Sequence, residues 1–181
     1  NLIHALVATE DVRYFEHSGV DVRGLVRVIK GILTVDTSSG GGSTISQQLA
    51  KMLFPRDNLN KIQLVFRKFK EWVIAVKLEK SYTKEEILTM YLNKYDFLNL
   101  AVGIKSAAAI YFNTTPNKLT IEQSAMLVGM AKNSSLYNPV RRPELTLQRR
   151  NVVLAQMAKY GYISKTERDL LKAHPLGIDF H

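Results

Sequence analysis

Apolar residues recur along the chain at the spacing of helix faces. In the first stretch, Ile3, Leu6, Val7, Glu10 and Tyr14 follow the i, i+3, i+4, i+7, i+11 pattern of one face. Glu10 therefore occupies a position where the periodicity expects an apolar side chain. Burial against that stripe disfavours a charged carboxylate, which suits a group that takes a proton from a hydroxyl near neutral pH. We predict a helix that reaches Tyr14 and presents Glu10 as a candidate general base.

The residues after Glu10 leave a second interpretation open. Asp11 points about 100° away round the same helix, where it can be solvated or paired. Glu10 itself can be read as a helix-end acid that a neighbouring Arg or Lys satisfies. Gly19 is expected to follow the helix end with positive φ, and His17 is interpreted as a structural residue that fixes this end.

The remaining pattern predicts further helices and no strands. Capping boxes, in which Ser or Thr is followed three residues later by Glu or Gln, mark several helix starts. No segment alternates over four or more positions as a strand does. The fold class is therefore predicted to be mainly α. The expected helices cover residues 22–35, 43–54, 62–80, 83–93 and 104–112, with others beginning near 120, 143 and 164.

Two of these helices carry basic side chains beside an apolar face. Helix 22–35 is either an anionic-membrane helix or an ordinary surface helix. In helix 62–80, Glu71 lies off the apolar stripe, one turn from Arg67 and Lys68, and its local interpretation is a surface ion pair. The apolar faces are predicted to contain Val22, Val26, Ile29 and Leu33 in the first helix, and Ile62, Phe66, Phe69, Val73 and Val76 in the second.

The composition points to an anionic partner. Of the 181 residues, 25 are Lys or Arg and 16 are Asp or Glu, which gives a net charge of +9. Phosphates on nucleic acid, lipid headgroups or a substrate fit this excess. The chain has no Cys, so a disulfide framework or a thiolate metal site is excluded. Its apolar runs are shorter than the ~20 residues of a membrane-spanning helix, and its start within a helix suggests a domain of a longer protein.

Five separated segments together match one family. They are EDVRYFEHSGVD from Glu10, GGSTISQQLAK from Gly41, RKFKE from Arg67, KEEILTMYLN from Lys84 and GIKSAAAIYF from Gly103. In this order they resemble the peptidoglycan glycosyltransferases, glycosyltransferase family 51, of class A penicillin-binding proteins and monofunctional transglycosylases. The resemblance implies a single domain over 1–181: a lysozyme-like helical head, a smaller membrane-facing lobe within about 20–66, and a cleft between them.

The resemblance also implies a reaction. Members polymerise lipid II at the outer face of the bacterial cytoplasmic membrane, as domains of membrane-anchored proteins, and the glycan donor is held on a polyprenyl pyrophosphate. By similarity, Glu10 is the general base on the acceptor hydroxyl, and transfer inverts the anomeric centre. Glu71 resembles the second carboxylate, which orients or stabilises the leaving pyrophosphate. The resemblance allows a divalent cation, Mg²⁺ or Mn²⁺, at Glu71, and no other cofactor is expected.

Several other residues match positions of the family's substrate site. The connector 55–64 is longer than usual, so Arg56 and Lys61 are both candidates for one further phosphate contact. Expected partners are lipid II, the nascent glycan-lipid pyrophosphate, the membrane surface and moenomycin-type inhibitors, with no nucleic acid. The substrate-binding residues implied by similarity are Asp11, Tyr14, Ser43, Thr44, Gln47, Gln48, Lys51, Arg67 and Lys68.

Two other functions compete with this hypothesis. A glycan-cleaving enzyme of lysozyme-like fold also uses an acid on a helical scaffold, but it has no use for Lys51, Arg67 and Lys68 near the site. A +9 helical domain can also bind nucleic acid. Against this function, the basic residues are dispersed and form no recognisable reading motif.

Overall fold

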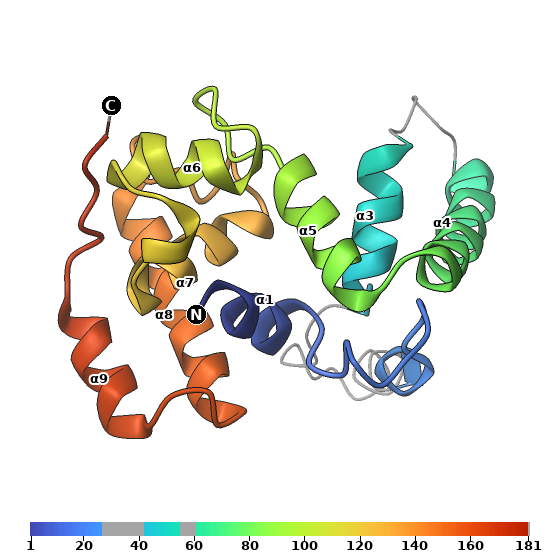
Figure 1. The fold of residues 1–181 in the computed structure, drawn as a ribbon, viewed down its shortest axis with the longest axis horizontal. Coiled ribbons are helices and arrows are strands. Elements are labelled where there is room, and N and C mark those ends of the chain that lie inside the picture. The colour runs from blue at the N-terminus through green and yellow to red at the C-terminus, as the bar shows by residue number, and fades with distance from the viewer. Residues whose placement is uncertain (27–41, 55–60, 181) are drawn as a thin grey trace. The chain divides into compact units, whose positions relative to one another are not determined.

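The computed structural model describes residues 1–26, 42–54 and 61–180, with the backbone alone at 61–65 (Figure 1). These residues form α-helices, a short 3-10 helix and an isolated antiparallel bridge between Asp96 and Val102. The prediction of a mainly α fold is confirmed. Within the same ranges, no helix has the length and apolar character needed to cross a bilayer.

The chain divides into two compact units. The larger consists of Asn1–Val12 and Leu92–His181, and the smaller of Arg13–Tyr91. The range 20–66, which the resemblance assigns to a smaller lobe, falls within the second unit. That unit extends beyond it at both ends.

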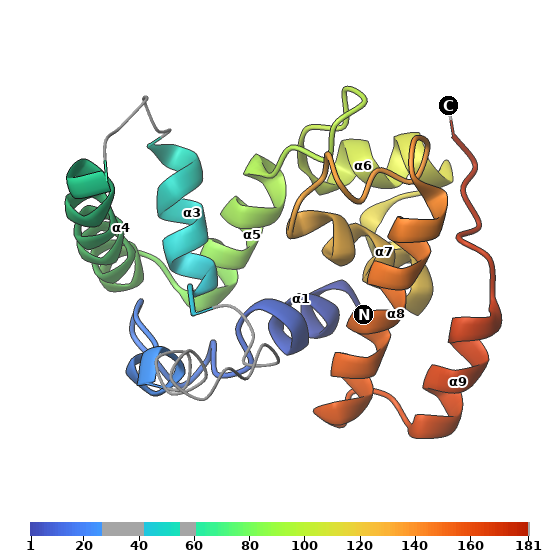
Figure 2. The same cartoon turned by 180° about the vertical axis from the view of Figure 1, so that it is seen from behind.

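The larger unit is centred on α7 (Ile121–Ala131), which is buried from Ser124 to its end. Helix α7 packs against α1, α8 and α9 (Figure 2). Arg150 on α8 is fully buried and donates to the carbonyls of Lys172 and Pro175, at 3.2 and 2.9 Å, which holds the C-terminal segment on this helix. The other elements of this unit are α1 (Leu2–Glu10), α6 (Gly103–Phe112), η1 (Pro116–Lys118), α8 (Pro143–Lys159) and α9 (Lys165–Ala173).

The described part of the smaller unit is formed mainly by three helices. Helix α3 (Ile45–Leu53) packs against α4 (Lys61–Ser81), and α5 (Lys84–Lys94) belongs to this unit up to Tyr91. Residues 22–26 are helical, in agreement with the start of the predicted helix 22–35. The rest of that prediction, including Ile29 and Leu33 of its apolar face, lies outside the described residues.

The predicted caps form as local hydrogen bonds. Thr120 and Gln123 make a complete capping box at the start of α7. In α5, the Glu86 carboxylate accepts from the Thr83 amide at 2.7 Å, and the Thr83 hydroxyl accepts from the Glu86 amide at 3.2 Å. These contacts lie within four residues, which explains why the sequence predicts them well.

Helix α1 is shorter than predicted. It ends at Glu10, because Asp11 adopts the non-helical conformation φ −158°, ψ 75°. Tyr14 therefore is not on the same helix face, although it is buried. It follows in a turn and donates its hydroxyl to the Lys84 carbonyl at 2.9 Å.

The predicted buried face of α4 is wrong. Phe66, Phe69 and Val73 are 66%, 55% and 55% exposed, and the side chain of Ile62 is not described. The inward face instead contains Glu71, Ala75 and Glu79, of which Glu71 is only 3% exposed. The two carboxylates are paired inside the smaller unit, and these ion pairs compensate for their burial.

Glu79 joins three segments of the smaller unit. Its carboxylate accepts from Ser46 Oγ at 2.5 Å and from Lys84 Nζ at 2.6 Å, and Lys84 Nζ also donates to the His17 carbonyl at 2.6 Å. His17 Nδ1 lies 3.9 Å from Glu79, and the His17 ring packs edge-on against Tyr14. This buried position agrees with the structural interpretation of His17.

Gly19 allows the turn after α1 to pack on α4. Its φ is +94°, and a Cβ here would lie 2.8 Å from backbone atoms of Ala75 and Val76. We expect Gly19→Ala to reduce the free energy of unfolding by about 2 kcal/mol or more, because left-handed strain and a backbone overlap add together. Denaturant unfolding measures this loss.

Gly161→Ala is the matched control. Gly161 also has positive φ, +78°, but nothing lies within 4 Å of the added Cβ. The Gly161→Ala variant should therefore lose only about 1 kcal/mol of the free energy of unfolding. If both variants lose the same free energy of unfolding, the contact of Gly19 with α4 contributes nothing to stability.

Candidate functional site

Glu10 is half-buried at the last position of α1 in the larger unit. Its side chain is 15% exposed, and Glu10 Oε1 lies 3.6 Å from Arg149 Nη2 on α8. The alternative interpretation, an acid paired with a neighbouring Arg, therefore holds as a description of geometry. This contact with Arg149 does not exclude proton transfer to Glu10, because the 3.6 Å between the two atoms is longer than a hydrogen bond.

The surroundings of Glu10 are largely closed. Asp11 is buried, so of the two expectations for it, solvation is wrong. Burial raises the pKa of the Tyr95 phenol, and the negative charge of Glu10 adds to this effect. Tyr95 Oη also lies within hydrogen-bond distance of the Met130 and Ala131 carbonyls, at 3.1 and 2.9 Å. Glu10 thus faces a cation and a neutral phenol inside a packed unit.

The smaller unit brings three predicted site residues together. Lys68 Nζ donates to Glu71 Oε2 at 3.1 Å and to Ser43 Oγ at 3.0 Å. Glu71 is nearly fully buried, so the interpretation as a surface ion pair is wrong, while Lys68 keeps 38% of its side chain exposed. A buried carboxylate thus fixes the position of a cation that solvent can reach.

A cavity of about 400 Å³ lies beside this cluster, between α3 and α4. Arg67 is among its lining residues and donates to the Phe54 carbonyl. Lys70, which the sequence interpretation missed, is one helical turn from Arg67, and that spacing was the available signal. Cations beside apolar walls suit an anion that carries a hydrocarbon tail. The lining residues are Ala50, Phe54, Phe66, Arg67, Lys70, Glu71 and Ile74.

The polar residues at the start of α3 make structural contacts. Thr44 is the N-cap, accepts from the Gln47 amide at 3.1 Å and donates to the Gly19 carbonyl at 2.7 Å. Gln47 is buried and its Nε2 also points to Gly19 O, at 3.4 Å. Gln48 accepts from the Tyr91 hydroxyl at 3.1 Å. Substrate contacts for these residues remain predictions.

Lys51 is exposed in the last turn of α3 and does not line the cavity. Arg56 and the Lys61 side chain lie outside the described residues. Tyr14 occupies a core position, with Lys84 Nζ 4.3 Å from its ring centroid. The predicted contacts of these residues with substrate stay predictions.

The side chains around Glu71 do not fit a metal held by the protein. Glu71 is the carboxylate among the residues that line the cavity, and Arg67 and Lys70 line it too. The hydrogen-bond donor to Glu71 is also a cation, Lys68. Over the described part of the chain, no three His, Cys, Asp or Glu residues come close enough to hold a metal ion. A site formed mainly by cations binds anions instead.

The chain is similar to known penicillin-binding proteins over nearly its whole length. The transglycosylase family model matches residues 1–158. The chain is 37% identical over 180 residues to penicillin-binding protein 1A of Escherichia coli, and 41% identical over 167 residues to penicillin-binding protein 2a of Streptococcus pneumoniae. These matches cover 99% and 92% of the chain but only 21% and 22% of the relatives, so the chain spans about a fifth of their length.

A solved structure supports the same relationship. The crystal structure of penicillin-binding protein 1A from Haemophilus influenzae matches with a TM-score of 0.52 and 28% identity. The match covers 75% of this chain and 17% of that chain. The chain therefore belongs to the transglycosylase family, and it is a helical glycosyl-transferring enzyme domain.

Proposed function

We propose that this domain is a peptidoglycan glycosyltransferase that polymerises lipid II into glycan strands. The observation that carries the proposal is the group of cations around the buried Glu71 beside an apolar-walled cavity. A donor that is both a pyrophosphate and a lipid needs both features. The family relationship supports the reaction class.

In the proposed reaction, the smaller unit handles the leaving group. Departure of pyrophosphate from the anomeric carbon concentrates negative charge on the leaving oxygens. Lys68, Arg67 and Lys70 supply positive charge that is already in place. Glu71 orients Lys68 through the 3.1 Å contact, so less reorganisation accompanies charge development.

Glu10 acts on the acceptor. Its carboxylate takes the proton of the acceptor sugar hydroxyl as that oxygen attacks the anomeric carbon of the donor. The bond to pyrophosphate breaks as the new glycosidic bond forms, and a direct displacement of this kind inverts the anomeric centre. Half-burial of Glu10 excludes much of the water that would compete as an acceptor.

The cation cluster separates this proposal from glycan cleavage. A glycoside hydrolase needs carboxylates around a neutral leaving sugar, whereas Lys68, Arg67 and Lys70 suit an anionic one. Incubation with lipid II and with finished glycan distinguishes the two reactions. Polymer from the first substrate supports transfer, and fragments from the second support hydrolysis.

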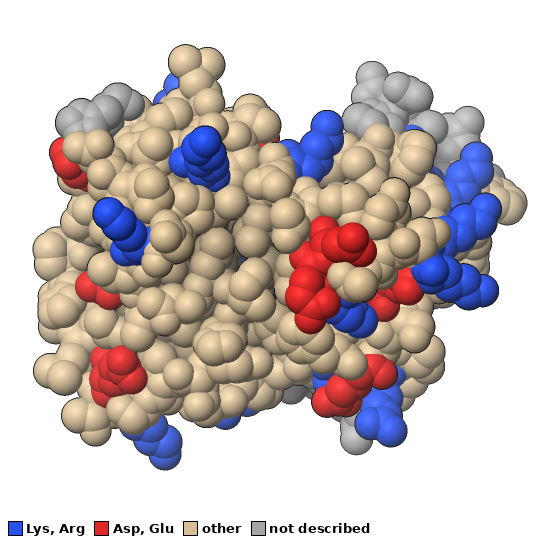
Figure 3. Space-filling model, in the orientation of Figure 1, with Lys and Arg blue, Asp and Glu red and all other residues tan. Residues whose placement is uncertain are grey.

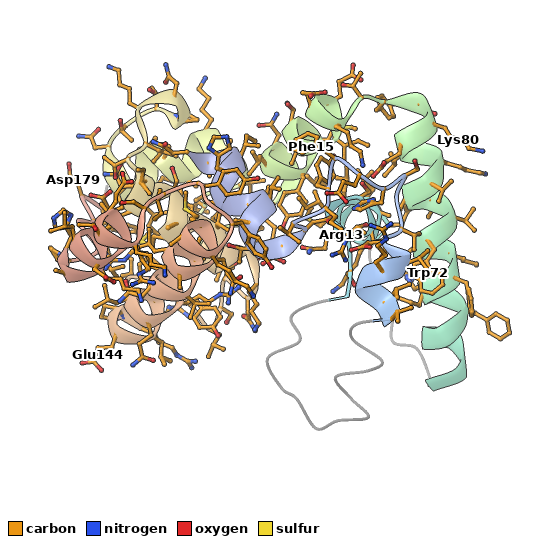
Figure 4. The ribbon with its side chains drawn as sticks, turned by 90° about the horizontal axis from the view of Figure 1, so that it is seen from below. Arg13, Phe15, Trp72, Lys80, Glu144 and Asp179 are labelled. Carbon is orange, nitrogen blue, oxygen red and sulfur yellow. The ribbon has the colours of Figure 1, made fainter. Side chains whose placement is uncertain are left out.

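We also propose that α4 rests on the membrane that holds the substrate's polyprenyl chain. Phe66, Phe69 and Val73 occupy one exposed face at the spacing i, i+3, i+7. Lys and Arg side chains gather over this helix (Figure 3), and Trp72 and Lys80 lie along it (Figure 4). An apolar stripe flanked by cations suits an anionic lipid surface. The proposed location is the outer face of the bacterial cytoplasmic membrane.

We expect Glu10→Gln to fold normally and to lose lipid II polymerisation by at least about 10²-fold. The amide keeps the shape of the side chain but cannot act as the base. Gel analysis of labelled glycan measures the rate. Glu144→Gln, which changes an exposed acid in the first turn of α8, is the control, and retained activity in Glu10→Gln would remove Glu10 from this role.

Arg67→Ala is expected to weaken binding of moenomycin, a phosphoglycolipid used as a donor mimic, by about ten- to a hundredfold. One charge-assisted contact is worth roughly 1.5–3 kcal/mol. Calorimetry measures the affinity, and Lys118→Ala in η1 of the larger unit is the control. Unchanged affinity in Arg67→Ala would place the phosphate site away from the cavity.

The double variant Phe66→Ser/Phe69→Ser should bind anionic vesicles at least about tenfold more weakly, since two apolar contacts with lipid are lost. Vesicle sedimentation measures the binding, and circular dichroism checks the fold. Leu170→Ser is matched in exposure, at 64%, but lies on α9 of the larger unit. An equal loss in this control would contradict a specific role for α4.

A further inference from the structure

The turn that joins α8 to α9 (Figure 1) carries two tyrosines on a fixed backbone. Gly161 in this turn has a φ of +78°, and its amide donates to the Ala158 carbonyl at 3.2 Å. The Tyr162 amide donates to the Met157 carbonyl at 2.9 Å. These two bonds form a Schellman motif, in which glycine is the left-handed residue after the helix. Tyr160 and Tyr162 flank this glycine, so their Cα atoms lie no more than about 7.6 Å apart.

The rings of both tyrosines reach solvent. Each tyrosine is 37% exposed, whereas Ile163, the aliphatic residue of the turn, is only 7% exposed. The Tyr162 ring stacks on the ring of the exposed His4, with centroids 4.7 Å apart and an interplanar angle of 21°. Lys159 Nζ lies 5.4 Å from the centroid of the Tyr160 ring. We call the surface formed by His4, Lys159, Tyr160 and Tyr162 the tyrosine platform.

The hydroxyls of the tyrosine platform are available to a ligand. A core tyrosine uses its hydroxyl inside the protein, as Tyr111 does when it donates to the Phe97 carbonyl at 2.7 Å. In the part of the chain that the structure describes, no residue bonds to the hydroxyls of Tyr160 and Tyr162. Each of these hydroxyls can both donate and accept a hydrogen bond. The platform therefore offers aromatic surface together with polar groups that the fold does not use.

We infer that the tyrosine platform binds the glycan strand that the domain synthesises. This inference rests on the proposed function, which supplies the strand. A sugar ring has an apolar C–H face that packs on an aromatic ring, and its polar substituents bond to a phenol hydroxyl at the ring edge. The peptides on a peptidoglycan strand end in carboxylates, with which Lys159 can pair. Rings, hydroxyls and cation thus match three chemical features of one ligand.

The tyrosine platform lies outside the candidate site but within the same unit. His4 and Glu10 are both on α1, six residues apart, which corresponds to about 9 Å along the helix axis. A strand of a few sugar units spans that distance. A strand held on the platform stays with the enzyme between successive transfers. The platform therefore favours long products.

A lipid surface is a poorer match for this turn. The proposed membrane face of α4 exposes an apolar stripe that contains Phe69 and Val73. In the turn, by contrast, the aliphatic side chain of Ile163 is buried, and the exposed rings of Tyr160 and Tyr162 carry hydroxyls. Such rings beside a cation favour a sugar polymer with spaced carboxylates over a continuous anionic surface.

Binding of chitohexaose, a peptide-free oligomer of N-acetylglucosamine, tests the tyrosine platform without any need for activity. In an NMR titration of the wild-type protein, we expect the largest shifts at the amides of Gly161 and Tyr162. Y160A/Y162A should bind at least about tenfold more weakly, because two ring contacts are lost. Y162F keeps the ring, so its affinity should stay within about threefold of the wild type. Y160A leaves the stacked pair intact and serves if the double variant does not fold.

Y82A is the control, because Tyr82 is 46% exposed but belongs to the smaller unit. Circular dichroism checks the fold of each variant. The inference is overturned if the wild type does not bind chitohexaose at millimolar concentrations, or if folded Y160A/Y162A binds it equally well. An equal loss in Y82A, or a loss of anionic-vesicle binding without a loss of chitohexaose binding, also overturns it.

The length of the strands made from lipid II is a second readout. Y160A/Y162A should form the first bonds at a rate within about twofold of the wild type, but release strands of about half the length or less, because faster dissociation ends elongation. Strands of wild-type length from a variant that has lost chitohexaose binding would contradict the inference. If the protein binds chitohexaose through the platform but does not polymerise lipid II, the proposed function fails and the glycan site stands. If it polymerises lipid II and the variants bind chitohexaose normally, only the inference fails.

Discussion

The smaller unit depends on two carboxylates that face inward from α4. Glu71 and Glu79 are both largely buried, and each is paired with a lysine, Lys68 at 3.1 Å and Lys84 at 2.6 Å. Burial of an unpaired carboxylate is costly, so these pairs fix how α4 is rotated against its neighbours. Because Ser43 and Ser46 also bond to this system, the start of α3 is positioned by the same charges.

The rotation of α4 has two consequences for function. Its cations and Glu71 lie beside the cavity shared with α3, which offers the proposed lipid donor both charge and apolar surface. Its aromatic residues Phe66 and Phe69 are left exposed. In an ordinary soluble helix this exposure would be unfavourable, whereas at a lipid surface the same residues contribute to binding.

The larger unit holds Glu10, the proposed general base, in a largely closed environment. Helix α1 ends at Glu10, and α7 lacks a side chain at Gly129, where α8 passes with Arg149. Glu10 is thus half-buried, with Arg149 Nη2 3.6 Å from its Oε1.

The sequence by itself determined the helices, their caps and the family, because each depends on residues close together in the chain or on motifs in order. Thr120 with Gln123 and Thr83 with Glu86 form bonds within four residues, which a pattern predicts directly. Only the tertiary structure decided which face of α4 is inward, that α1 ends before Asp11, and that Arg149 lies beside Glu10. Apolar periodicity cannot reveal that the ion pairs of Glu71 with Lys68 and of Glu79 with Lys84 are buried, or that Lys68 also donates to Ser43 on a distant segment. These polar contacts outweighed the apolar stripe of α4.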